Sequence, residues 1–125
     1  MSKRLLLIDD EDGARQIIQF SLEAAAGWQV LTAASGAEGL KLATIERPDA
    51  ILLDVMMPGM DGTTTFQHLQ RNPATHSIPV ILLTAKASAM EHEPLTKLGI
   101  AGIITKPFKI PALIASIRSC LKWND

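Results

Sequence analysis

The amino-acid sequence predicts an α/β domain with a doubly wound sheet of five parallel strands in the order 2-1-3-4-5 and five helices. Short apolar runs alternate with longer stretches of helical periodicity, five times over 125 residues. Most runs are apolar throughout, as expected of parallel strands that helices cover on both faces. No linker interrupts the alternation, so residues 1–125 are expected to form one domain.

Each predicted strand is a short run that ends near a polar residue. Trp28–Ala33 is less apolar than the others, which indicates an edge strand. Pro79 is tolerable only at the first residue of its strand, because proline cannot donate to the sheet. The remaining predicted strands are Leu5–Ile8, Ala50–Leu53, Ile78–Leu83 and Ala101–Ile104.

The predicted helices have recognisable ends. The first has helical spacing from Ala14 and stops at Gly27, and Ser35 caps the second, which reaches about Glu46. Asp61 is expected to cap the third. Pro94 disfavours the interior of the fourth, and Pro111 is allowed in the first turn of the last. The last three helices are expected between Asp61 and Asn72, after Ser88 as far as Leu98, and from Ile110 to Leu121.

Charge and composition exclude several classes of function. The chain has 12 Lys and Arg against 13 Asp and Glu, so it offers no basic surface and no direct contact with nucleic acid is expected. Its one cysteine, Cys120, cannot form an internal disulfide and fits a reducing compartment. The apolar run Leu5–Ile8 is too short for a signal peptide or a membrane span. A cytoplasmic protein without a membrane partner is therefore expected.

Polar side chains gather where the predicted strands end. Asp9 and Asp10 follow the first strand, Asp54 the third, Thr84 the fourth and Lys106 the fifth. In a sheet of order 2-1-3-4-5 these ends lie at one edge, around the switch point where ligands bind. One acid would suffice to cap a helix, and the excess indicates oxygen ligands for Mg²⁺.

These groups suit phosphoryl transfer. A carboxylate oxygen of Asp54 can attack phosphorus, with Mg²⁺ held by Asp9, Asp10 and Asp54. Lys106 is placed to neutralise the phosphoryl oxygens, and the Thr84 hydroxyl to donate to one of them.

Four motifs in this order resemble the receiver domains of bacterial two-component response regulators, including the stand-alone chemotaxis regulators. They are Leu7-Ile8-Asp9-Asp10-Glu11, Asp54 with Met57-Pro58-Gly59-Met60-Asp61-Gly62, Leu83-Thr84-Ala85 and Thr105-Lys106-Pro107-Phe108. The resemblance implies that Asp54 accepts a phosphoryl group from a sensor histidine kinase or a phosphotransfer protein. It also implies a Mg²⁺ ligand from the Met56 backbone carbonyl and a cis bond between Lys106 and Pro107.

The same resemblance implies a switch rather than an enzyme, since such domains catalyse only their own phosphorylation and dephosphorylation. Phosphorylation is expected to change the face formed by the fourth helix, the fifth strand and the fifth helix, where a downstream protein or a second copy would bind. Ile103 stands where relatives often carry an aromatic residue, and the chain has no Tyr. The expected readout is therefore a rearrangement of residues 85–98 rather than rotation of a ring.

Other functions are compatible with parts of the same pattern. A stand-alone role is expected, but a receiver domain cut from a larger response regulator or hybrid kinase has the same motifs. A Mg²⁺-dependent aspartyl-phosphate phosphatase of the haloacid dehalogenase type would need an acid two residues after Asp54, where Met56 stands. A flavodoxin would need a phosphate-binding loop rich in Ser, Thr and Gly after the first strand. The acids from Asp9 to Asp12 stand there and would repel the FMN phosphate.

Overall fold

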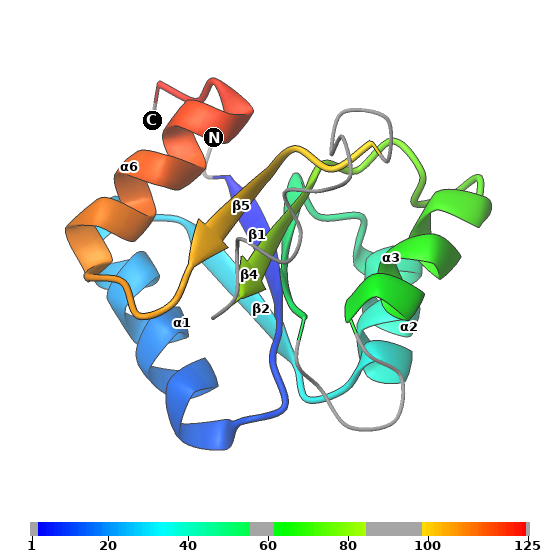
Figure 1. Cartoon of the computed structure of the whole chain (residues 1–125), viewed down its shortest axis with the longest axis horizontal. Coiled ribbons are helices and arrows are strands. Elements are labelled where there is room, and N and C mark those ends of the chain that lie inside the picture. Colours follow the sequence, from blue (N-terminus) through cyan, green and yellow to red (C-terminus); the bar gives the residue numbers. More distant parts are fainter. Residues whose placement is uncertain (1–2, 56–61, 85–98, 125) are drawn as a thin grey trace.

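A computed structural model describes residues 3–55, 62–84 and 99–124 of the chain. Strands and helices alternate as the sequence predicts (Figure 1). Four of the five predicted helices fall within these residues, and the helix expected after Ser88 lies outside them. The elements are β1 Arg4–Ile8, α1 Asp12–Ala26, β2 Gln29–Ala33, α2 Gly36–Glu46, β3 Ala50–Asp54, α3 Gly62–Arg71, β4 Val80–Thr84, β5 Gly102–Thr105 and α6 Ile110–Leu121.

The five strands form one parallel sheet in the order β2-β1-β3-β4-β5, which confirms the predicted topology. Strand β2 is at an edge, as its lower apolar content indicated. The register pairs Ile8 with Leu53, and Thr84 with Thr105. The strands therefore end together, and the residues that follow them meet at one edge of the sheet.

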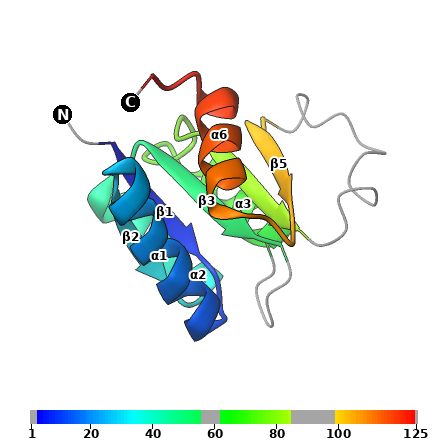
Figure 2. The same ribbon diagram turned by 90° about the vertical axis from the view of Figure 1, so that its left-hand side faces the viewer.

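Helices cover both faces of the sheet. Helices α1 and α6 lie on one face and α2 and α3 on the other, and a quarter turn brings α1 and α6 in front of the strands (Figures 1 and 2). Alternate residues of β1 point to opposite sides, with Leu5 and Leu7 in one buried cluster and Leu6 and Ile8 in the other. This two-sided burial is why β1 is apolar from Leu5 to Ile8.

The helix ends largely follow the sequence signals. Gly27 ends α1 in a left-handed conformation, with φ of 75°. The Ser35 hydroxyl accepts a hydrogen bond from the Glu38 backbone N–H at 3.1 Å and caps α2, as predicted. The predicted cap Asp61 lies outside the described residues. In the parts of the chain that the structure describes, no helix is both long and apolar enough to cross a membrane.

The expectation for Pro79 was wrong by one residue. Strand β4 begins at Val80, so Pro79 precedes the strand instead of opening it. Its carbonyl still accepts a hydrogen bond from the Ile51 N–H of the neighbouring strand at 2.9 Å. Proline can supply this acceptor but no donor, and the regular pairing therefore starts only at the next residue.

Candidate phosphoryl-acceptor site

The site lies at the carboxyl edge of the sheet, around the ends of β1 and β3. Asp9 follows β1, and its N–H donates to the Ala33 carbonyl at the end of β2. Asp54 is the last residue of β3. Because β1 and β3 are neighbours whose following helices cover opposite faces, this is the switch point of the sheet, where α/β folds bind ligands.

Three carboxylates converge there. One oxygen from each of Asp9, Asp10 and Asp54 lies within 4.8 Å of the other two. Asp9 is fully buried and Asp54 is 4% exposed, whereas Asp10 is exposed. Buried carboxylates of like charge repel each other strongly unless a cation compensates them. The structure thus brings together the three side chains that the sequence predicted as metal ligands.

Asp9 has one oxygen engaged and one without a hydrogen bond. Its Oδ1 accepts from the Glu11 backbone N–H at 3.0 Å. Its Oδ2 is buried and has no hydrogen-bond partner among the described residues. A buried polar atom of this kind calls for an ion or a water. An all-oxygen donor set with one exposed member fits Mg²⁺, which keeps several waters when bound.

Lys106 extends into the same cluster from the end of β5. Its Nζ lies 3.4 Å from Asp54 Oδ1 and 3.8 Å from Asp9 Oδ2. The side chain remains 29% exposed, so the ammonium faces both the buried acids and solvent. The peptide bond between Lys106 and Pro107 is cis, which confirms the expectation.

Thr84 and Met56 complete the list of predicted site residues. Thr84 is the last residue of β4 and is 2% exposed. Its carbonyl accepts from the Lys106 backbone N–H at 2.8 Å, which ties the two strand ends together. Met56, whose carbonyl was expected as a metal ligand, lies outside the described residues.

The first residue of α3 fixes the position of Asp54. The Gly62 N–H donates to the Val55 carbonyl at 3.0 Å. A Cβ atom on Gly62 would lie 2.6 Å from the Asp54 carbonyl oxygen and 2.6 Å from Val55 Cα. Only glycine allows α3 to begin this close to the end of β3.

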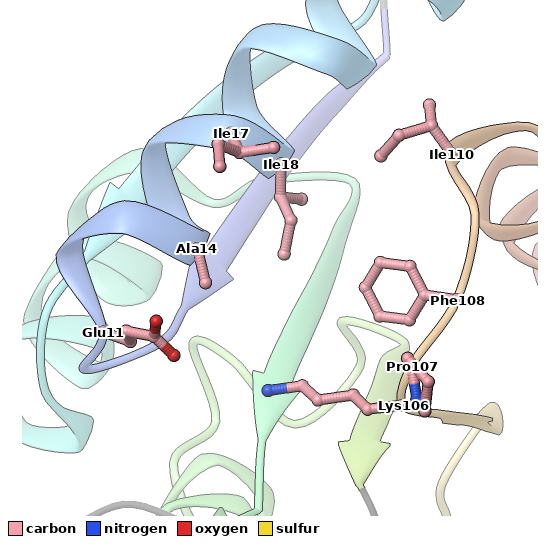
Figure 3. Close-up of a pocket in the computed structure, with 8 residues that line it drawn as sticks. All are labelled: Glu11, Ala14, Ile17, Ile18, Lys106, Pro107, Phe108 and Ile110. Atoms are coloured by element: carbon pink, nitrogen blue, oxygen red, sulfur yellow. The ribbon is translucent and has the colours of Figure 1, made fainter.

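A pocket of about 580 Å³ adjoins the site between α1 and the segment before α6. Figure 3 shows Ile18 facing Phe108 and Ile110 across it. The lining residues are Glu11, Ala14, Ile17, Ile18, Lys106, Pro107, Phe108 and Ile110. Ile17, an apolar residue of α1 that lines this pocket, is 64% exposed.

One further residue at the site was not predicted from the sequence. Arg15, in α1, pairs with Asp12 and donates to the backbone oxygen of Asp9. The spacing between Asp12 and Arg15 is the one at which helical side chains meet, so the ion pair could have been predicted. The contact with Asp9 depends on the tertiary turn and could not.

Comparisons with known proteins agree with this geometry. The family model of the response regulator receiver domain matches residues 5–118. The chain is 36% identical to the DNA-binding dual master transcriptional regulator RpaA of Synechocystis, covering 98% of this chain and 50% of that protein. It spans about half the length, or less, of the curated relatives it matches.

Many solved structures share the fold. The chemotaxis protein CheY4 of Vibrio cholerae superposes with a TM-score of 0.87 at 29% identity, covering 96% of this chain and 99% of CheY4. The receiver domain of the sensor histidine kinase PA1611 from Pseudomonas aeruginosa, solved with a magnesium ion in its active-site cleft, gives 0.85 at 26% identity. That match covers 98% of this chain and 100% of the PA1611 domain. The chain therefore belongs to the response regulator receiver domains, the phosphorylation switches of two-component signalling.

Proposed function

We propose that Asp54 accepts a phosphoryl group from the phosphohistidine of a sensor histidine kinase or phosphotransfer protein, with Mg²⁺ bound by Asp9, Asp10 and Asp54. The observation that carries the proposal is the convergence of a nearly buried carboxylate, two further acids and one ammonium at the switch point. A purely structural role for these groups would leave Asp9 Oδ2 buried without a hydrogen bond among the described residues.

The chain's own residues supply most of the chemistry. A carboxylate oxygen of Asp54 forms a bond to phosphorus as the bond between phosphorus and the imidazole nitrogen breaks, and the nitrogen keeps the electron pair. The Lys106 ammonium, 3.4 Å from Asp54, would compensate the charge of the transferred group. The Thr84 hydroxyl, at the neighbouring strand end, would donate a hydrogen bond to one of the phosphoryl oxygens. Bound Mg²⁺ would offset the negative charge of the acids and of the phosphoryl oxygens.

Two findings support the proposed Mg²⁺ site and the proposed contact with a phosphoryl-donor protein. The PA1611 receiver domain, whose fold this chain shares, has a magnesium ion in its active-site cleft. The apolar pocket beside Lys106 gives a donor protein a surface to contact while its phosphohistidine reaches Asp54. The Met56 carbonyl remains an expected further ligand.

We expect the output to be a changed surface rather than a chemical product, because the site catalyses only its own phosphorylation and dephosphorylation. The expected face includes β5 and α6, together with the helix predicted between residues 88 and 98, which lies outside the described residues. A downstream protein or a second copy of the chain would bind there, in the cytoplasm.

We also propose that the domain acts as a stand-alone switch without direct contact to nucleic acid. RpaA, twice as long, is a DNA-binding regulator, so a receiver within a longer protein is the alternative.

Intact-mass analysis after incubation with acetyl phosphate and Mg²⁺ tests the proposal. The wild type should gain the mass of one phosphoryl group, and chelation of Mg²⁺ or the variant Asp54→Asn should abolish the gain. Asp49 precedes the other end of β3, where its carboxylate accepts from the Arg4 N–H, so Asp49→Asn is the matched control and should label normally. Undiminished labelling of Asp54→Asn would contradict the assignment.

A further inference from the structure

Arg15 connects the two ends of the acidic loop that carries Asp9 and Asp10. Its Nη1 donates to the Asp9 backbone oxygen at 2.8 Å, and its Nη2 pairs with the Asp12 carboxylate. The guanidinium is largely buried, with 15% of the Arg15 side chain exposed. One planar group therefore spans the turn between β1 and α1.

This turn needs support from outside because its own residues repel one another. Residues 9–12 are four consecutive acids, and Glu11, at the N-cap position before α1, makes no side-chain capping hydrogen bond. Asp9 Oδ1 accepts a hydrogen bond from the Glu11 N–H, and the Asp9 carboxylate also belongs to the group of three acids with Asp10 and Asp54. Among the described residues, Lys106 contacts the Asp9 carboxylate of this turn and Arg15 contacts its backbone.

We infer that Arg15 is a positioning residue for the cation site. By fixing the Asp9 carbonyl it fixes the backbone from which the Asp9 and Asp10 carboxylates project, so that their oxygens already lie within 4.8 Å of each other and of Asp54. Groups that orient metal ligands in this way change metal affinity without touching the ion. The inference rests on the proposed function, since it concerns the ion proposed at these three acids.

Removal of Arg15 would change Mg²⁺ affinity in opposite directions, depending on whether Arg15 acts through its charge or by positioning Asp9. A positive charge near the site opposes the approach of another cation, so its removal would tighten Mg²⁺ binding if charge were its only role. Loss of the contact with Asp9 would instead let the repelling acids separate and would weaken binding. Lysine keeps the charge, but it lacks the planar fork that serves a carbonyl and a carboxylate together.

Calorimetric titration of the unphosphorylated protein with Mg²⁺ separates the two effects. Both Arg15→Gln and Arg15→Lys should weaken Mg²⁺ binding, by about tenfold. Asp12→Asn, which removes only the carboxylate partner, should weaken it less. Circular dichroism checks that each variant is folded at the titration temperature. Tighter binding by Arg15→Gln with unchanged binding by Arg15→Lys would overturn the inference in favour of charge alone, and unchanged binding by both would overturn it outright.

Arg4 provides a matched control at the other end of β1. Its Nη1 donates to the Glu46 backbone oxygen at 3.0 Å, and its Nη2 pairs with the Glu46 carboxylate at 3.1 Å. Arg4→Gln and Arg4→Lys should therefore lower the free energy of unfolding to a similar extent as the Arg15 variants do. They should leave Mg²⁺ affinity unchanged. If they weaken Mg²⁺ binding equally, the effect is general destabilisation and the inference is wrong. Failure of the proposed function would be distinct, because the wild type itself would then bind no Mg²⁺.

Discussion

Lys106 Nζ lies 3.4 Å from Asp54 Oδ1 and forms the ion pair at the centre of the candidate site. The same nitrogen lies 3.8 Å from Asp9 Oδ2, so one ammonium offsets two buried carboxylates. In the absence of Mg²⁺ this cation therefore has a structural role as well as the chemical one proposed above.

Replacing Lys106 by Met should lower the free energy of unfolding in the presence of a chelator by about 2 kcal/mol. The loss is smaller than for a fully buried pair because Lys106 is partly exposed. Added Mg²⁺ should reduce the difference, since it supplies the missing positive charge. Urea unfolding with and without Mg²⁺ measures both effects. Lys41→Met, on the exposed side of α2, is the control. A Lys106→Met protein as stable as the wild type without Mg²⁺ would refute the structural role.

Gly62→Ala should disturb Asp54 directly. The new methyl group would lie 2.6 Å from the Asp54 carbonyl oxygen, and backbone must move to accommodate it. We expect a loss of about 1–3 kcal/mol in urea unfolding and slower labelling by acetyl phosphate. Gly13→Ala, where a Cβ would meet nothing within 4 Å, should leave both unchanged or slightly improved. Equal effects of the two substitutions would show that the contact with Asp54 is unimportant.

Two side chains of α1 cover the free edge of β2. Gln19 Nε2 donates to the Val30 carbonyl at 2.8 Å, and the Val30 N–H donates to Glu23 Oε2 at 3.2 Å. The double variant Gln19→Ala, Glu23→Ala should expose these backbone groups, quicken exchange of the Val30 amide and promote self-association. Hydrogen exchange and light scattering measure the two effects. Gln16→Ala, on the exposed side of α1, should change neither. Unaltered exchange of the Val30 amide in the double variant would contradict the protective role.

Burial raises the pKa of the Cys120 thiol above its ordinary value of 9.0. The folded state thus holds this proton more tightly than the unfolded state does. Its contribution to stability is complete below the unfolded pKa and is lost as pH rises through the folded value. The stability of the wild type relative to Cys120→Ala should therefore fall as pH rises above about 9. Urea unfolding across this range tests it, and a difference independent of pH would contradict the raised pKa.

The sequence predicted most of the site because strand ends can be located from composition alone. The apolar runs before Asp9 and Asp54 have one plausible role, that of buried parallel strands, and their final residues must then share an edge. The start of β4 was predicted incorrectly. Ile78 and Pro79 continue the apolar pattern, but hydrogen-bond pairing, which composition does not record, begins at Val80.

Local patterns in the sequence determined the strand and helix alternation, the edge position of β2 and the identity of the acids and of Lys106, because hydrophobic periodicity and strand-end residues act over a few neighbouring positions. Only the tertiary structure decided that Arg15 reaches back to the Asp9 carbonyl, that Gln19 and Glu23 cover the edge of β2, and that a pocket opens beside Lys106. These contacts depend on the angle at which each helix packs on the sheet. That angle is set by the summed packing of residues far apart in the chain, and no local pattern encodes it.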